Sequence, residues 1–169
     1  MYKNKIGEAC GTSSYIRLFP KYLKNAKRFL EIGTYDGIIV SLLAEKLPNI
    51  QFYVIDPFIN GENSGAGHKD YFLKNTQDLA NIHLYENKTE DVKPFDNSFF
   101  DFAFIDGDHS YRCTKIDIEF CWDSVKSGGY IAIHDYFIME GVRKAIDEFI
   151  NAVGVNFVRE EDVALIKRK

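Results

Sequence analysis

The sequence has few cysteines and no cysteine motif. Cys10, Cys113 and Cys121 are the three cysteines among 169 residues, and none belongs to a C-x-x-C pair. If Cys113 and Cys121 lie on one helix, their spacing of eight residues corresponds to about 12 Å, which is too far for a disulfide. We therefore expect reduced thiols, as is typical of an intracellular protein.

Long apolar runs and an excess of positive charge are also absent. The first eleven residues, MYKNKIGEACG, contain no apolar stretch of signal-peptide length. No run approaches the roughly 20 apolar residues that cross a bilayer. The formal net charge of −4 argues against a polyanion as the main partner. These absences predict a cytoplasmic protein whose partners include neither a membrane nor nucleic acid.

The composition that is present suits one globular domain. Apolar residues make up 46% and aromatic residues 15% of the chain, which is ample for a buried core, so we expect a single domain over residues 1–169. Apolar runs of strand length alternate with segments of helical periodicity, the pattern of an α/β protein with a parallel sheet covered on both faces. The predicted strands are residues 29–32, 51–55, 82–85, 99–105, 130–134, 156–159 and 163–167.

The predicted helices complete a doubly wound, Rossmann-like architecture whose last two strands form an antiparallel hairpin. Residues 1–25 form an N-terminal helical segment, and Gly128 and Gly129 are expected to cap the helix before the fifth strand. Residues 57–69 contain three glycines and predict either a lid or substrate loop or a plain flexible insertion. The expected helices are residues 12–23, 38–47, 70–79, 115–125 and 142–152.

The segment FLEIGTYDG, residues 29–37, places a short strand, an acid and a glycine-bracketed turn directly before a helix. In open α/β folds this first crossover lies at the carboxyl end of the sheet, where ligands bind. Glu31 and Asp36 would repel a pyrophosphate, because two unit charges about 4 Å apart interact by roughly 4 kcal/mol at an effective dielectric of 20. The loop therefore favours a cationic ligand over a dinucleotide.

The pattern E-x-G-x-x-x-G, followed by an acid at the end of the next strand, resembles the class I S-adenosylmethionine-dependent methyltransferases. That acid is Asp56, which lies 23 residues beyond Gly33. The spacing is near the roughly 20 residues at which α/β nucleotide sites place a carboxylate on ribose hydroxyls. The resemblance implies that S-adenosylmethionine binds here, with the contact residues Glu31, Gly33, Thr34, Tyr35, Gly37, Asp56 and Pro57.

The residues after the third predicted strand depart from the family pattern. Members commonly have a small residue, an acid and a hydroxyl there, whereas this chain reads Asn87, Lys88, Thr89 and Glu90. The Lys88 ammonium cannot accept a hydrogen bond from the adenine amino group. We expect Thr89 to contact the adenine and Glu90 to substitute for the missing acid.

Two polar segments follow the fourth and fifth predicted strands, and they read IDGDHSY and IHDY. Because neighbouring parallel strands end at the same edge, we expect their carboxylates and imidazoles to share one rim. These groups match a hard or borderline divalent cation. Successive strand residues point to opposite faces, so His134 and Asp135 can both reach one ion only if the strand has already ended. The full set is Asp106, Asp108, His109, His134 and Asp135.

These segments resemble the macrocin-type sugar O-methyltransferases and the related cephalosporin-hydroxylase-like proteins, over roughly residues 26–136. The resemblance implies that Asp106 and Asp135 bind Mg²⁺, that His109 is the general base, and that Asp106 also borders the cofactor. His134 stands where the sugar enzymes have an acid. It is expected either as a ligand of Mg²⁺ or another divalent cation, or as a supporting or core residue.

Together the two sites predict a metal-assisted O-methyltransferase that acts on a hydroxyl of a small molecule, such as a sugar. An NAD-type oxidoreductase is the rival enzyme, and a cofactor-binding protein without catalysis is the alternative outside the enzymes. Some 25 residues precede the first predicted strand. Acceptor contacts would then have to come from residues 57–69 or from a partner subunit, which leaves a homo-oligomer open.

Overall fold

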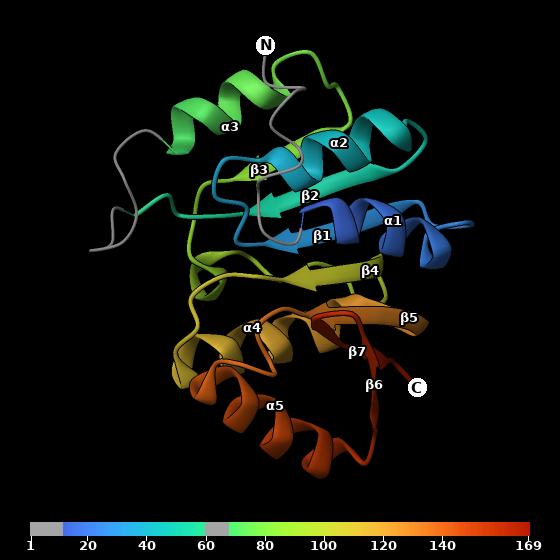
Figure 1. Ribbon diagram of the computed structural model, residues 1–169, viewed down its shortest axis with the longest axis vertical. Helices are drawn as coiled ribbons and strands as arrows, with labels where there is room; N and C mark the ends of the chain where they lie inside the picture. The colour runs from blue at the N-terminus through green and yellow to red at the C-terminus, as the bar shows by residue number, and fades with distance from the viewer. Residues whose placement is uncertain (1–11, 60–67) are drawn as a thin grey trace.

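The computed structural model describes residues 12–59 and 68–169, which form a sheet with helices on both faces (Figure 1). The strand order is β3-β2-β1-β4-β5-β7-β6. Strands β1 to β5 are parallel, and β7 is antiparallel to both β5 and β6. The predicted fold class is confirmed. The strands are β1 (Arg28–Ile32), β2 (Gln51–Ile55), β3 (Ile82–Tyr85), β4 (Phe100–Ile105), β5 (Val125–Ile133), β6 (Phe157–Glu160) and β7 (Val163–Lys167).

The helices follow the predicted order with shifted ends. Residues 60–67, the centre of the predicted lid or substrate loop, lie outside the described residues, and Lys69 belongs to a helix. None of the helices in the described ranges has both the length and the apolar character needed to cross a membrane. The helices are α1 (Thr12–Tyr22), α2 (Ile38–Lys46), α3 (His68–Thr76), the short 3-10 helix η2 (Thr89–Asp91), α4 (Tyr111–Ser124) and α5 (Glu140–Val153).

The sheet separates two apolar cores, as the two-residue period of a strand requires. In β4, Phe102 and Phe104 join the core under α1, α2 and α3, whereas Ala103 and Ile105 join the core under α4 and α5. Phe29 of β1 stacks on Phe102, with ring centroids 5.4 Å apart. Burial on both faces explains why β4 is a continuous apolar run in the sequence. The carboxyl ends of β1, β2 and β4 are thereby held at one edge.

Helix α4 is longer than the helix predicted over residues 115–125. The Ser110 hydroxyl accepts a hydrogen bond of 3.3 Å from the Cys113 backbone nitrogen, so the helix begins at Tyr111. Cys113 and Cys121 both lie on α4 and neither forms a disulfide. This agrees with the expectation from their spacing.

The predicted helix cap at Gly128 and Gly129 is wrong, because both glycines lie inside β5. The helix ends at Ser124, and the backbone is already extended at Val125. The register between β4 and β5 shifts in this region, and Gly128 has a φ of 79°. A Cβ on Gly129 would lie 2.7 Å from the Asp101 carbonyl oxygen. The two glycines thus permit an irregular, close pairing of strands.

Candidate functional site

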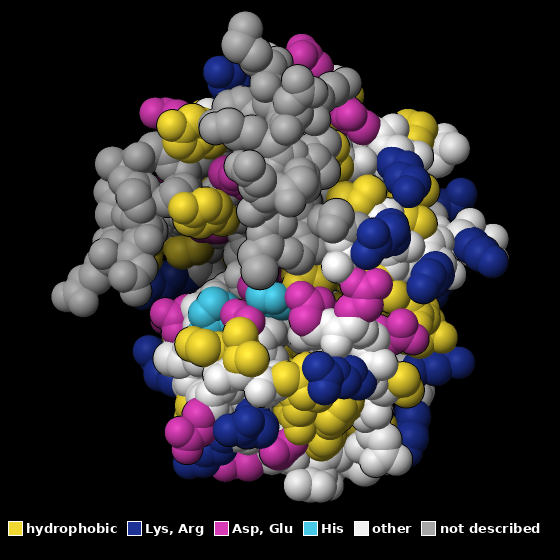
Figure 2. All heavy atoms as spheres, viewed as in Figure 1, with side chains coloured by type: hydrophobic (Ala, Val, Ile, Leu, Met, Phe, Trp, Pro, Cys, Tyr) yellow, Lys and Arg dark blue, Asp and Glu magenta, His cyan; other side chains and the backbone are white. Residues whose placement is uncertain are grey.

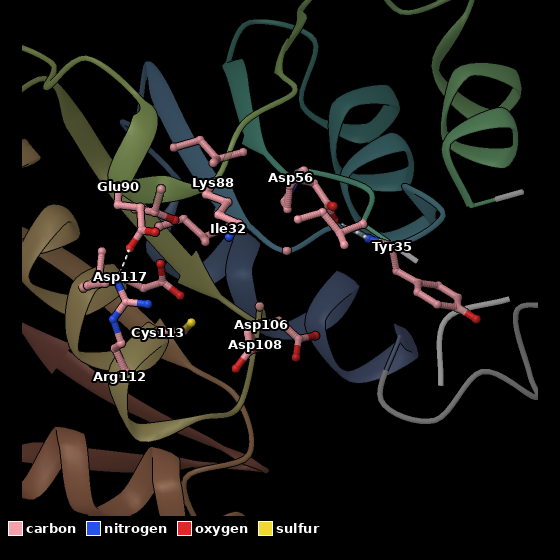
Figure 3. Close-up of a pocket in the computed structure, with 17 residues that line it drawn as sticks. Ile32, Tyr35, Asp56, Lys88, Glu90, Asp106, Asp108, Arg112, Cys113 and Asp117 are labelled. Atoms are coloured by element: carbon pink, nitrogen blue, oxygen red, sulfur yellow. Dashed lines mark hydrogen bonds and ion pairs between the residues drawn. The ribbon is translucent and has the colours of Figure 1, made fainter. Parts of the chain in front are cut away.

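A cavity of about 520 Å³ lies at the carboxyl ends of β1, β2 and β4 and is closed on one side by α4 (Figure 3). This is the edge at which the sequence placed a ligand. The cavity is lined by most, but not all, of the residues that were expected to contact a cofactor. Those that line it are Gly33, Tyr35, Asp56, Pro57, Thr89, Glu90 and Asp106, and those that do not are Glu31, Thr34 and Gly37.

Glycines set the course of the loop between β1 and α2. Gly33 has a φ of 80°, and a Cβ there would lie 2.3 Å from the Asp106 carbonyl oxygen. Only glycine allows this approach of the loop to the end of β4. Gly37 has a φ of 74°, and a Cβ there would lie 2.6 Å from the Phe72 ring of α3. Gly37 therefore serves packing against α3, and Gly33 shapes the cavity wall.

Asp56, at the end of β2, organises the same loop. Its Oδ2 accepts hydrogen bonds from the backbone nitrogens of Thr34 at 2.8 Å and Tyr35 at 3.1 Å. Its Oδ1 accepts a hydrogen bond of 2.7 Å from the Phe58 nitrogen. An ionised carboxylate has about four acceptor positions. Asp56 can therefore hold the loop and still accept from a ligand hydroxyl in the cavity that it lines.

Glu31 and Asp36 lie away from the cavity wall. The Glu31 side chain is 1% exposed and accepts a hydrogen bond of 2.7 Å from the Thr34 hydroxyl. Burial raises the pKa of Glu31 to about 8, so the group is largely protonated at neutral pH. Asp36 accepts a hydrogen bond of 3.1 Å from the Ile38 nitrogen at the start of α2. The negative charge on the cavity wall comes instead from other carboxylates, chiefly Asp56, Asp106 and Asp108.

Asp117 of α4 lines the cavity and was missed in the sequence. It is 4% exposed, and burial raises its pKa to about 6, although a hydrogen bond with the Thr89 side chain opposes the shift. Nearby, Arg112 of α4 pairs with Glu90 of η2 at 3.2 Å (Figure 3). A signal for Asp117 did exist, because it occupies a position of the buried stripe of α4. That stripe consists of Thr114, Asp117, Ile118, Cys121 and Ser124.

A cluster of two carboxylates and two imidazoles lies beside the cavity. One ligand atom from each of its four residues lies within 4.8 Å of all the others. Figure 2 shows histidine side chains next to acidic ones on this face of the molecule. One member, Asp106, also lines the cavity. The four residues are Asp106, His109, His134 and Asp135, and we refer to them as the His/Asp cluster.

The end of β5 explains how adjacent residues join the cluster together. The strand stops directly before His134, and Asp135 has a φ of 58°. The Asp135 carbonyl oxygen accepts a hydrogen bond of 2.8 Å from the Met139 nitrogen, so the chain has already turned toward α5. His134 Nδ1 lies 2.9 Å from Asp106 Oδ1 and 3.2 Å from Asp135 Oδ2. The strand break that two adjacent ligands would require is therefore present.

The electrostatics of the His/Asp cluster suit a cation. Burial opposes protonation of His134, but a hydrogen bond with Asp106 and the charge of Asp135 raise its pKa to about 9. In turn, despite burial, the two imidazoles lower the pKa of Asp106. Contact with Asp106 raises the pKa of His109. The carboxylates thus attract positive charge, whether a proton on an imidazole or an ion.

His109 provides a direct test of whether the cluster fits a metal ion. Its Nε2 lies 2.9 Å from Asp135 Oδ2 and 3.7 Å from Asp106 Oδ1. Neither approach has hydrogen-bond geometry, and this buried nitrogen has no hydrogen-bond partner among the described residues. Buried polar atoms without partners are rare in proteins. A nitrogen left in this state beside two carboxylates fits a site that takes a cation between the carboxylates or a donor at the nitrogen.

Asp162 and Tyr15 support His134 from the side away from Asp106. The Tyr15 hydroxyl donates a hydrogen bond of 2.8 Å to Asp162 Oδ2, and this oxygen lies 3.4 Å from His134 Nε2. The Tyr15 ring also meets the His134 ring edge-on, with centroids 5.7 Å apart. Tyr15 belongs to α1 and Asp162 to the turn between β6 and β7. No local pattern links residues so far apart, so sequence reasoning could not find them.

The sequence matches the family model described as "Methyltransferase domain" over residues 30–136. A curated relative, an uncharacterized protein of Acanthamoeba polyphaga mimivirus, is 28% identical over 125 residues. This match covers 67% of the present chain and 53% of the relative, so the chain spans about half the length of the curated relative.

Two solved structures share the fold. The O-methyltransferase NovP superposes with a TM-score of 0.73 and 20% identity, over 91% of this chain and 78% of that one. CalS11, described as a TDP-rhamnose 3'-O-methyltransferase in calicheamicin biosynthesis, superposes with a TM-score of 0.68 and 14% identity. That match covers 92% of this chain and 77% of CalS11. At these identities the likeness concerns the fold, which is the class I arrangement that the sequence predicted.

Proposed function

Because the chain belongs to the family of methyltransferase domains, we propose that it is a metal-assisted O-methyltransferase that uses S-adenosylmethionine and acts on a small hydroxylated molecule. The position of Asp106 carries this proposal. Asp106 lines the cavity and is also a member of the His/Asp cluster. A methyl donor in the cavity and an acceptor hydroxyl at the His/Asp cluster would then lie next to each other, because both would adjoin Asp106.

S-adenosylmethionine supplies a methyl group on a positively charged sulfur. Asp56 would accept from the ribose hydroxyls while it holds the glycine loop with its other acceptor positions. The carboxylates of Asp106 and Asp108 give the cavity a negative wall that suits a cationic ligand. Gly33 and Tyr35 would bring loop backbone against the ligand, and Pro57 and Thr89 form part of the cavity wall.

Asp106, His134 and Asp135 would hold the divalent cation. Such an ion lowers the pKa of a hydroxyl and fixes its oxygen for reaction. The strand break before His134 lets both of the adjacent side chains reach the same point. Asp162 and Tyr15 would orient the His134 ring from behind, as supporting groups commonly orient ligating histidines.

His109 is the candidate general base. Its Nε2 faces the carboxylates of the cluster and is without a hydrogen-bond partner among the described residues, so it can accept the proton of an acceptor hydroxyl. The neighbouring Asp106 raises the pKa of His109, which makes the neutral ring a stronger base. The base must be neutral to act, so it works above its own pKa.

A sugar is our preferred acceptor, because two vicinal hydroxyls can chelate an ion. The fold shared with NovP and with CalS11, one an O-methyltransferase and the other a TDP-rhamnose 3'-O-methyltransferase, supports methyl transfer to oxygen and a sugar acceptor. Membership of the methyltransferase family removes the support for an NAD-type oxidoreductase. A protein that binds the cofactor without catalysis remains as an outcome of the test.

The test is transfer of a labelled methyl group from S-adenosylmethionine to a panel of hydroxylated acceptors, with and without divalent ions. We expect transfer to one class of sugar or diol and loss of transfer on chelation, restored by added metal. The double variant Asp106→Asn with Asp135→Asn should lose metal-stimulated transfer. Binding without transfer across the panel would favour the non-catalytic alternative, and full activity after chelation would remove the ion from the mechanism.

A further inference from the structure

The adenine of the cofactor has an amino group that needs a partner in the cavity. Resting on the proposed function, we propose that Asp117 accepts the hydrogen bond from this exocyclic amino group. Family members accept this hydrogen bond with an acid in the segment after β3. In this chain that segment contains Lys88, Thr89 and Glu90. The acceptor would then come from helix α4 instead of from the loop after β3.

The placement of the lining residues points to this assignment. In the view of Figure 3, Asp56 and Tyr35 lie toward one side of the cavity, and Asp117 and Glu90 lie toward the other. If Asp56 holds the ribose, the purine must extend along the cavity toward η2 and α4. Its outer edge then reaches the region of Asp117.

The lining of the cavity also suits a flat aromatic ring. Its apolar side chains come from two separate segments, Pro57 and Ile59 after β2, and Cys113 and Ile116 of α4. Apolar walls with a small number of fixed polar groups are typical of ligand sites. A purine held between such walls has its polar atoms at the edge, where Asp117 adjoins Ile116.

The other candidates for the amino group are less suited. Glu90 already pairs with Arg112 at 3.2 Å, and its side chain is 35% exposed. The Lys88 ammonium has no acceptor. Asp117 is 4% exposed and lines the cavity together with Thr89. It is thus the more deeply buried of the two carboxylates.

The environment of Asp117 also calls for a donor. Asp108 and Glu90, both negatively charged, act on it together with the Thr89 hydroxyl, and none of these groups is a cation. A buried carboxyl is costly to leave with few hydrogen bonds. The amino group of adenine offers two N–H donors, and the Asp117 carboxylate can accept a hydrogen bond from one of them. Ligand binding would therefore supply a further donor to this buried carboxyl group.

The experiment compares two ligands by calorimetry. S-adenosylhomocysteine carries the amino group, and its analogue with hydrogen in place of that amino group does not. We expect the wild type to bind the analogue about 10- to 100-fold more weakly, as for loss of a hydrogen bond to a charged group. In Asp117→Ala the two ligands should bind with similar affinity, because the partner of the amino group is gone.

Two variants serve as comparisons. Glu119→Gln, an exposed carboxylate on the same helix, should keep the wild-type discrimination between the ligands. If Glu90→Gln loses the discrimination while Asp117→Ala keeps it, Glu90 is the partner and the assignment is overturned. Wild type that binds both ligands equally also overturns it, although the proposed function survives. Wild type that binds neither ligand overturns the proposed function itself.

A crystal structure of the wild type with S-adenosylhomocysteine tests the same contact without any variant, should Asp117→Ala fail to fold. We expect the exocyclic nitrogen within about 3.2 Å of an Asp117 carboxylate oxygen. A nitrogen bound elsewhere, with Asp117 out of reach, would refute the assignment.

Discussion

His134 Nδ1 lies 2.9 Å from Asp106 Oδ1, although 28 residues separate the two along the chain. The contact arises because β4 and β5 are parallel neighbours that end at the same edge of the sheet. It places an imidazole between two carboxylates, at a position where the sequence resemblance implied a third carboxylate. The nature of the donors, more than their number, then decides which ion the cluster prefers.

We expect the protein to bind Mn²⁺ or Co²⁺ at least about tenfold more tightly than Mg²⁺. Imidazole is a good ligand for borderline transition metals, whereas Mg²⁺ prefers oxygen, and affinity for a mixed site generally rises from Mn²⁺ onward in the first-row series. Calorimetric titration of the metal-free protein measures this directly. His134→Asp should reduce the difference in binding affinity between Mg²⁺ and the two transition metals.

His83→Ala is the matched control for the metal titration. His83 belongs to the edge strand β3, and its Nε2 lies 2.8 Å from Gln51 Oε1, away from the His/Asp cluster. The preference among metals should not change in this variant. Equal or tighter binding of Mg²⁺ by the wild type would show that His134 is not a ligand.

His109→Ala should reduce turnover by about 10²- to 10⁴-fold, the usual range for loss of a general base, and leave S-adenosylhomocysteine binding within about twofold. Because Asp106 raises the pKa of His109, the wild-type rate should rise with pH until the ring has lost its proton. This rise should be absent from the residual activity of the variant. Steady-state kinetics over pH 5 to about 9 on both proteins gives the comparison, and unchanged turnover would rule out the base.

The sequence was sufficient to predict the order of the strands, most of their bounds and the edge of the sheet that carries the cavity, because these depend on local patterns. The exception is β5, which was predicted over residues 130–134 and begins at Val125. The apolar run of β4 and the glycine turn after β1 are recognisable without any partner, and both were placed within a residue or two. Gly128 and Gly129 misled the prediction because a glycine pair is equally suited to a helix end and to an irregular strand. Only the closeness of Asp101 in the neighbouring strand decides between the two.

Charges on the cavity were harder to predict, because burial decides which carboxyls are ionised. From the sequence, Glu31 was expected to be a charged residue of the glycine loop. In the structure it is buried in β1 and largely protonated at neutral pH. Asp117 reads as one charged residue of a helix, yet it lines the cavity. The difference at Glu31 follows from packing between distant segments, whereas Asp117 could have been identified from its position in the buried stripe of α4. A charge argument from sequence therefore identified the correct edge of the sheet with partly incorrect residues.

Gly33→Ala should destabilise the protein far more than Gly154→Ala. Both glycines have positive φ, at 80° and 66°, so each substitution carries backbone strain of about 1 kcal/mol. A Cβ on Gly154 meets no atom of the described residues within 4 Å, whereas one on Gly33 lies 2.3 Å from the Asp106 carbonyl oxygen. We expect an additional loss of at least about 1–2 kcal/mol for Gly33→Ala, together with weaker cofactor binding.

Urea denaturation of the two glycine variants measures the difference, and calorimetry with S-adenosylhomocysteine measures the binding. Gly154 caps the far end of α5, so its variant should bind the ligand like the wild type. Equal losses of stability in the two variants would mean that the loop moves away from β4 without penalty, and would contradict the close fit at Gly33.

Glu31→Gln should stabilise the ligand-free protein increasingly as pH rises. The pKa of Glu31 is about 8 in the folded protein against an ordinary value of 4.5, so between these values the unfolded chain has lost a proton that the folded protein retains. Stability from this group is therefore greatest below about pH 4.5 and falls toward pH 8, by at most about 1.4 kcal/mol for each pH unit. Glutamine keeps the hydrogen bond from Thr34 and has no proton to lose.

The free energy of unfolding, measured in urea at pH 5 and pH 8, should favour the variant much more at pH 8. Glu119→Gln removes an exposed carboxylate and should follow the wild type at both values. If the free energy of unfolding changes equally between pH 5 and pH 8 in the wild type and in Glu31→Gln, Glu31 is ionised in the folded protein.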